Sequence, residues 1–204
     1  MSFFENTKKP TGVGGTLMVS MMNFGHSALA DWGLGFLPLP KDARVLDCGC
    51  GGGANIHKML KQCPEGIVKG IDYSPVSVEK AKKVNQRYIA AGRCVIFQDN
   101  VQKIIFATDW FDFVTAFETV YFWTDLSQSF REIYRVLKPG GTFLICNECD
   151  GENAKDDKWT EKIDGMKIYT GEELQSILES VGFYNVQMHH HPKGWLCITA
   201  QKQA

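Results

Sequence analysis

The sequence predicts an α/β fold: a doubly wound, seven-stranded mixed sheet, made of five parallel strands and a C-terminal antiparallel hairpin, with helices on both faces. Two observations favour this architecture. From about residue 43, short apolar runs alternate with stretches of helical period, and strands separated by helices pair in parallel through right-handed crossovers. Near the end, the strand-like runs 183–189 and 195–201 instead face each other across a short turn rich in turn-forming residues, which indicates a hairpin.

The first half of the sheet is predicted from three apolar runs and the helices between them. The second of these helices has clear boundary signals. Ser74 stands at its N-cap, Pro75 is in its first turn and Gly92 follows its end. The expected strands cover 43–48, 66–72 and 94–99, and the expected helices cover 54–63 and 74–91.

The second half follows the same alternation. The segment Lys138–Gly141, which reads Lys-Pro-Gly-Gly, is expected to end one helix and to turn the chain into the fifth strand. Thr170 and Glu173 have the spacing of a capping box before another helix, which Gly182 ends. The expected strands cover 111–117 and 142–148, and the expected helices cover 125–137 and 170–181.

Composition narrows the class of protein. With 204 residues, of which 44% are hydrophobic, the chain is long enough for one domain with a full core. The net charge of −1 offers no broad electrostatic attraction for nucleic acid or anionic lipid, and no apolar run approaches the ~20 residues that span a bilayer. Residues 1–10 lack the apolar core of a secretory signal. We therefore expect a cytoplasmic protein whose seven cysteines are reduced thiols.

Two segments lie outside the alternation of strands and helices. Residues 1–40 are expected to form an N-terminal helical cap or lid, with a flexible apolar stretch at 17–22, on a domain that covers 41–204. The polar residues 150–168 indicate an insertion after the fifth strand. Both segments could lie over the carboxyl ends of the strands, where open α/β sheets bind their ligands.

A glycine-rich loop, Gly49–Gly53, joins the first strand to the first helix. Without side chains the backbone there can turn sharply and approach a ligand closely, although this pattern alone also fits a dinucleotide site. Three acids make the prediction of a ligand site more specific. Asp47, Asp72 and Asp99 stand at the ends of three consecutive strands around the loop. A carboxylate at the end of the second strand can accept both ribose hydroxyls, so the sequence predicts a pocket for an adenosine.

Five motifs, in matching order and spacing from about residue 43, resemble those of the class I S-adenosylmethionine-dependent methyltransferases of the small "type 11" kind, whose fold is Rossmann-like. They are VLDCGCGGG, GIDYSP, FQDN, FDFVTAFETVYFW and LKPGG. The resemblance implies S-adenosylmethionine as the cofactor and methyl transfer as the activity. The resemblance also assigns residues to the parts of the cofactor. The methionine part would be held by Asp47, Gly49, Cys50 and Gly51, and the ribose and adenine by Asp72, Tyr73, Asp99, Asn100 and Val101. Phe117 and Glu118 would lie near the sulfonium.

The segment after the fourth strand is expected to serve the methyl acceptor. Glu118 is the candidate base or acceptor-orienting group, and Tyr121 could steer the acceptor. Phe122 or Trp123 could exclude water, although core packing explains Trp123 equally well. His26, in the cap, is a further candidate base. We expect a small-molecule acceptor, whose reacting atom (oxygen, nitrogen or sulfur) stays undetermined, bound by a monomer or a homodimer.

Two other functions remain open from the sequence. A nicotinamide-dependent oxidoreductase would share the glycine loop and Asp72, but it usually needs a further substrate domain, which the length and the terminal hairpin disfavour. A non-catalytic S-adenosylmethionine-binding sensor or regulatory protein would share the whole pocket. Nucleic acid is the less favoured acceptor, because the chain has no basic stripe.

Cysteines and histidines raise the question of a metal site. Cys48 lies close to Cys50, and Cys146 to Cys149, but residues three apart on a strand point to opposite faces. We therefore predict small buried thiols and no metal, with thiol or arsenic chemistry as the alternative, because the strand ends that bear Cys50 and Cys146 border the predicted pocket. The run His189–His191, beside the hairpin turn, is expected to form a solvated sheet edge.

Overall fold

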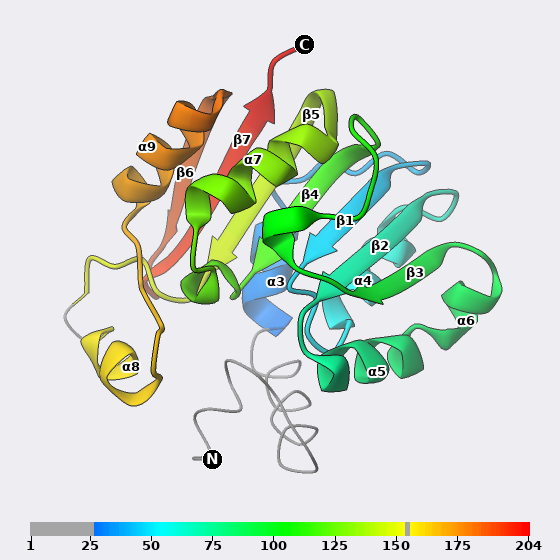
Figure 1. Ribbon diagram of the computed structural model, residues 1–204, viewed down its shortest axis with the longest axis horizontal. Coiled ribbons are helices and arrows are strands. Elements are labelled where there is room, and N and C mark those ends of the chain that lie inside the picture. Colours follow the sequence, from blue (N-terminus) through cyan, green and yellow to red (C-terminus); the bar gives the residue numbers. More distant parts are fainter. Residues whose placement is uncertain (1–26, 154–155) are drawn as a thin grey trace.

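Seven strands form one mixed sheet in the computed structural model, which describes residues 27–153 and 156–204 (Figure 1). The strands are β1 (Arg44–Cys48), β2 (Ile67–Asp72), β3 (Cys94–Gln98), β4 (Phe111–Phe117), β5 (Leu137–Asn147), β6 (Phe183–His191) and β7 (Trp195–Lys202). They lie in the order β3-β2-β1-β4-β5-β7-β6. The pairs among β1 to β5 are parallel, and β7 is antiparallel to both β5 and β6. The predicted sheet and its terminal hairpin are confirmed.

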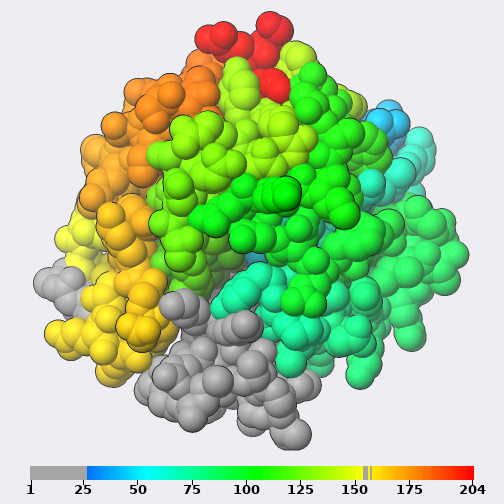
Figure 2. Space-filling model, in the orientation of Figure 1, coloured from blue at the N-terminus to red at the C-terminus, as the bar shows by residue number. Residues whose placement is uncertain are grey.

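Helices cover both faces of the sheet. One face carries α3 (Ser27–Leu34), α4 (Ala54–Gln62), α5 (Pro75–Val84) and α6 (Gln86–Ala90), and the other carries α7 (Leu126–Val136) and α9 (Gly171–Val181). Figure 2 shows this second face, with α9 in orange beside α7 in yellow-green. The short elements η1 (Val101–Lys103), η2 (Val120–Phe122) and α8 (Asp157–Lys162) lie in the loops after β3, β4 and β5. Since the strand order reverses at β1, the ligand crevice of such a sheet is expected at the carboxyl ends of β1 and β4.

The helix expected over 74–91 is broken in two by a buried asparagine. Its start is as predicted, since the Ser74 hydroxyl accepts a hydrogen bond from the backbone N–H of Ser77. The side-chain amide of Asn85, however, donates to the carbonyls of Gly53 at 2.9 Å and Ala81 at 3.0 Å. These bonds end α5 and hold it against the glycine loop, so the single-helix prediction was wrong at this point.

The boundaries of β5 and α9 follow the turn residues. The capping box of Thr170 and Glu173 is confirmed. Helix α7 ends at Val136, just before the Lys-Pro-Gly-Gly segment, but β5 already begins at Leu137 and includes this segment. The pairing of β4 with β5 shifts there, from Phe111 opposite Leu137 to Phe113 opposite Thr142. The extra residues form an irregularity inside the strand instead of a separate turn.

Helix α3 belongs to the predicted N-terminal cap and packs on the sheet. Its Leu29, Ala30 and Leu34 are buried, and a side chain on Gly33 would meet the Cys146 sulfur at 2.7 Å. Residues 1–26, which include His26 and the stretch 17–22, lie outside the described residues. In the described part of the chain no helix combines the length and the apolar character needed to cross a membrane.

The cysteines are small core residues, as predicted, because all seven are free and buried. The histidines differ from the expectation of a solvated edge. His189 stacks on Phe36 with ring centroids 3.9 Å apart, and His191 stacks on Trp195 at 4.3 Å. Both therefore pack on the face that α3 covers, and His190 alone of the three is exposed.

Candidate active site

The glycine loop after β1 is fastened to the end of β2. The backbone N–H groups of Gly49 and Cys50 donate to the Ile71 carbonyl at 2.8 and 3.0 Å, and that of Gly51 donates to a carboxylate oxygen of Asp72 at 2.9 Å. Gly49 and Gly51 have φ angles of 71° and 51°, in the left-handed region that residues with a Cβ avoid. The path of the loop therefore requires glycine at both positions.

Asp72 is the buried acid of this arrangement. Its other carboxylate oxygen accepts the backbone N–H of Ser74 at 2.9 Å, and the residue is 8% exposed. Burial raises the pKa of Asp72, while the N–H groups of Ser74 and Gly51 oppose this rise. Because each carboxylate oxygen can accept two hydrogen bonds, Asp72 keeps the capacity to accept two hydroxyls from a ligand.

A cavity of about 320 Å³ lies at the carboxyl ends of the strands, a volume within the range of small-molecule sites. The glycine loop and the ends of β2 and β3 form its polar wall. Helix α3 and the segment after β4 form its apolar wall. The predicted site residues that line the cavity are Gly49, Cys50, Gly51, Asp72, Tyr73, Asp99, Asn100, Val101, Phe117 and Glu118.

Asp47 is a predicted site residue that does not line the cavity. It is 1% exposed, and one of its oxygens accepts the Thr115 hydroxyl at 2.7 Å. The other oxygen has no hydrogen-bond partner among the described residues. Burial raises the pKa of Asp47 to about 7, with the Thr115 hydrogen bond opposing the rise and the charge of Asp72 adding to it. Asp47 is thus a buried acid behind the loop.

At the end of β3 the polar groups are held by local backbone bonds. The Asp99 carboxylate accepts the N–H groups of Asn100 at 2.9 Å and Ile105 at 3.0 Å. The Asn100 side chain accepts the N–H of Gln102 at 3.0 Å and so caps η1. Tyr73, at the end of β2, is 41% exposed. These contacts fix Asp99 at the cavity wall with acceptor capacity left over.

Glu118 holds a special backbone position at the end of β4. Its φ of 56° places a non-glycine residue in the left-handed region, which costs free energy and is typical of functional sites. Its carboxylate accepts the Tyr121 hydroxyl at 3.3 Å and the backbone N–H of Glu148. The Tyr121 hydroxyl in turn accepts the N–H of Cys149 at 2.9 Å. Groups from the loops after β4 and β5 therefore orient Glu118.

Tyr121 contacts Glu118 but does not line the cavity, and only 3% of the residue is exposed. Burial, together with the charge of Glu118, raises the pKa of Tyr121 well above its usual value. The hydroxyl is therefore neutral and can donate to Glu118 over the whole physiological range. The structure thus places the Tyr121 hydroxyl against Glu118 and not on the cavity wall, whereas the sequence suggested that Tyr121 steers the acceptor.

The apolar wall includes residues that the sequence did not single out. Leu29 and Ala30 of α3 line the cavity beside Phe122 and Trp123. Trp123 is also part of the core, and its indole N–H donates to the Thr119 hydroxyl at 3.2 Å. The cap was expected over the strand ends, but no spacing within it points to Leu29 or Ala30.

Comparisons with known proteins agree with this geometry. A family model described as a methyltransferase domain matches residues 46–145. The chain is 29% identical over 156 residues to a sterol 24-C-methyltransferase of Debaryomyces hansenii, across 72% of this chain and 41% of that protein. It is 24% identical over 182 residues to an uncharacterized methyltransferase of Bacillus subtilis, across 88% of this chain and 94% of that protein. A SAM-dependent methyltransferase structure from Aquifex aeolicus has a TM-score of 0.76 at 19% identity and covers 91% of this chain and 97% of its own. The chain spans less than half the length of the first curated relatives it matches.

The fold is Rossmann-like, and the family model identifies a methyltransferase domain within it. The chain belongs to the class I S-adenosylmethionine-dependent methyltransferases, so the predicted family and its cofactor, S-adenosylmethionine, are confirmed. The residues present also suit that cofactor. A Cβ on Gly51 would meet no atom within 4 Å, which leaves room for a ligand against the loop backbone, and Asp72 and Asp99 supply acceptors on the same wall.

Proposed function

We propose that this protein transfers a methyl group from S-adenosylmethionine to a small, largely apolar acceptor, and that Glu118 orients the acceptor and receives its proton where it has one to lose. The observation that carries the proposal is the composition of the cavity at the carboxyl ends of the strands. It joins a polar wall that suits an adenosine to an apolar wall from α3 and η2, and Glu118 lines the same space.

The polar wall has groups for each part of the cofactor. We assign the ribose hydroxyls to Asp72, the adenine amino group to Asp99, the adenine ring to Tyr73 and Val101, and the methionine part to the glycine loop. When bound, the cofactor supplies an electrophilic methyl group on a sulfonium. The chain's own contribution is to hold the two reactants in line and to exclude water.

The apolar wall supports an acceptor with little polar surface. Leu29, Ala30, Phe122 and Trp123 offer no charge to a ligand, and they remove its apolar surface from water. The similarity to a sterol methyltransferase favours the same chemical class. Glu118 is the ionisable group at the apolar end of the lining, and a carboxylate held by two donors keeps acceptor positions for an O–H or N–H.

Turnover with labelled cofactor tests this proposal. The chain is incubated with methyl-labelled S-adenosylmethionine and a library of small apolar alcohols, phenols, amines and thiols, and the products are identified by mass spectrometry. We expect label in one acceptor class, and we expect Glu118→Gln to lower turnover while cofactor affinity stays unchanged. Tight cofactor binding without product from any acceptor would favour a sensor instead. Label found only in added protein or RNA would refute the small-molecule acceptor.

A further inference from the structure

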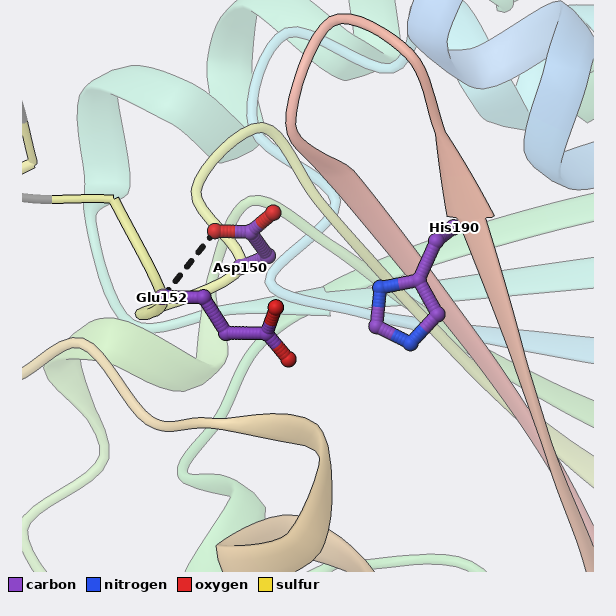
Figure 3. Close-up of side chains that lie close together, drawn as sticks. All are labelled: Asp150, Glu152 and His190. Carbon is purple, nitrogen blue, oxygen red and sulfur yellow. Dashed lines mark hydrogen bonds between the residues drawn. The ribbon is translucent and has the colours of Figure 1, made fainter.

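We propose that Asp150, Glu152 and His190 form a binding site for a divalent transition-metal ion, outside the methyl-transfer pocket. One ligand atom from each of the three side chains lies within 4.8 Å of the others. Figure 3 shows the two carboxylates, on the loop after β5, beside the imidazole, on β6. None of the three residues lines the cavity that holds Glu118.

The strand geometry of β6 separates His190 from its neighbours. His189 and His191 pack against Phe36 and Trp195, on the face that α3 covers. Because successive side chains of a strand point to opposite faces, His190 is turned toward the loop after β5. The histidine run thus contributes one imidazole to the cluster, and the other two are occupied by ring stacking.

Asp150 makes this cluster more than a group of surface acids, since it is 8% exposed. One of its oxygens accepts the backbone N–H of Glu152 at 3.0 Å. Among the described residues no hydrogen bond reaches its other oxygen. This second oxygen is therefore open to a ligand, and a bound cation would pair with the charge of a carboxylate that is nearly buried.

The local charge also favours a cation. The cluster holds two carboxyl groups, and within residues 27–153 and 156–204 no lysine or arginine forms an ion pair with either acid. Lys193, in the hairpin turn close by in sequence, lies over the Trp195 ring at 5.0 Å instead. The cluster is therefore a concentration of negative charge without a protein counter-charge in the described part of the chain.

The donor set selects the kind of metal. Imidazole is a preferred ligand of Zn²⁺, Fe²⁺ and their neighbours, whereas Mg²⁺ and Ca²⁺ prefer oxygen alone. Two carboxylates and one imidazole therefore suit Zn²⁺ or Mn²⁺ better than Mg²⁺. Three protein donors leave coordination positions for water.

An ion here would fasten the loop after β5 to the edge of the sheet. The two residues before Asp150 contact the active site: the N–H of Glu148 donates to the Glu118 carboxylate, and the N–H of Cys149 donates to the Tyr121 hydroxyl. Tying Asp150 to β6 through the ion would hold this loop in the arrangement that orients Glu118. We therefore assign the ion a structural role, visible as stabilisation of the fold.

Calorimetric titration of the untagged, chelator-treated chain with Zn²⁺ and, separately, Mn²⁺ tests the site. We expect one equivalent of either ion to bind, more tightly than Mg²⁺, and to raise the midpoint of thermal unfolding. Glu152→Gln and His190→Gln should each remove this binding, and both residues are exposed, so the variants are expected to fold. The matched control is His189→Gln, which changes a histidine on the opposite face and should keep the stoichiometry.

Weak binding that is equal in the natural chain, in His190→Gln and in Glu152→Gln would mean adventitious surface ions only and would overturn the proposal. Binding lost equally in His189→Gln would also refute the assignment, because it would place the ion elsewhere. Cofactor affinity is measured on the same samples. Since neither readout uses methyl transfer, failure of the metal site leaves the proposed function intact.

Discussion

The carboxylate of Asp72 accepts the backbone N–H of Gly51 at 2.9 Å, and both residues line the cavity. One side chain therefore closes the glycine loop onto β2 and also presents acceptor oxygens to a ligand. Its second backbone partner, the N–H of Ser74, begins α5. The end of β2 thus connects the loop, the helix and the pocket.

Replacing Asp72 by alanine should remove cofactor binding. The variant loses the acceptor for both ribose hydroxyls, and hydrogen bonds to a charged group contribute about 1.5–3 kcal/mol each, so the affinity should fall by roughly a hundredfold or more. Calorimetry with S-adenosylmethionine measures the loss. Near-ultraviolet circular dichroism checks that the fold is kept. Unchanged affinity would show the ribose assignment to be wrong.

A control for this experiment is Asp125→Ala. The Asp125 carboxylate caps α7 by accepting the N–H of Gln128 at 2.9 Å, and it does not line the cavity. Loss of a cap costs about 1 kcal/mol. This variant should therefore lower stability while cofactor affinity stays at the natural value, which separates loss of the pocket from loss of the fold.

Tyr121→Phe should lower turnover more than binding. The change removes the hydroxyl that donates to Glu118 and leaves the buried N–H of Cys149 without its acceptor, which costs about 1–3 kcal/mol of unfolding free energy. Once an acceptor is known, kcat should fall while cofactor affinity and KM change little. Tyr134→Phe, which alters a tyrosine packed against Phe183 away from the cavity, should leave kcat unchanged. If Tyr121→Phe turns over at the natural rate, Tyr121 does not position Glu118.

Sequence periodicity was enough for the fold because each element carries its own signal. The apolar period, the Ser74 N-cap and the Thr170 capping box all act within a few residues, and the structure has them. The break in the helix expected over 74–91 carries no such signal. It depends on the Asn85 side chain and the carbonyl of Gly53, which lie far apart in sequence and meet only when α5 packs on the loop.

The polar wall of the cavity could be predicted for a similar reason. Its acids and glycines are at the ends of strands, so the strand prediction itself brings them together. Leu29 lies on a helix that reaches the cavity through packing on the sheet. Asp150 and His190 come together because β5 and β6 are both antiparallel to β7, so their carboxyl ends lie at the same edge of the sheet. Such contacts follow from tertiary packing, and a motif read along the chain does not contain them.

Asp47 should make stability fall as pH rises. The ordinary pKa of this carboxyl is 3.8, and burial raises it to about 7 in the folded chain. Between these values the folded state holds a proton that the unfolded state has lost, so the free energy of unfolding decreases with rising pH across this window. Each pKa unit corresponds to about 1.4 kcal/mol, which sets the effect at a few kcal/mol in order of magnitude. Asp47→Asn has no proton to lose and should flatten the decline in urea unfolding.

Thr115→Val gives the complementary test of Asp47. The Thr115 hydroxyl donates to Asp47 at 2.7 Å and opposes the rise of its pKa. Without that donor the pKa should rise further, so the decline in unfolding free energy should extend to higher pH. Parallel pH profiles for the natural chain, Asp47→Asn and Thr115→Val would mean that Asp47 does not titrate in this range.

Gly49→Ala and Gly51→Ala form a matched pair that separates the two roles of the loop. Both glycines have a left-handed backbone, where alanine costs about 1–2 kcal/mol. A Cβ on Gly49 would also lie 2.1 Å from the Thr119 hydroxyl oxygen, and such overpacking adds typically about 1–3 kcal/mol. Gly49→Ala should therefore lose more unfolding free energy in urea titrations than Gly51→Ala does.

Cofactor affinity should instead be lowered by Gly51→Ala, the variant that loses less stability. A Cβ on Gly51 meets no protein atom within 4 Å, so its methyl group would occupy space in the cavity that a ligand needs. Gly51→Ala should keep most of its stability and yet bind S-adenosylmethionine about tenfold or more weakly, since about 1.4 kcal/mol corresponds to a factor of ten. If Gly51→Ala binds as tightly as the natural chain, the cofactor does not approach the loop backbone at this point. Gly51 would then be required by the turn alone, and the methionine part of the cofactor would have to be assigned elsewhere on the cavity wall.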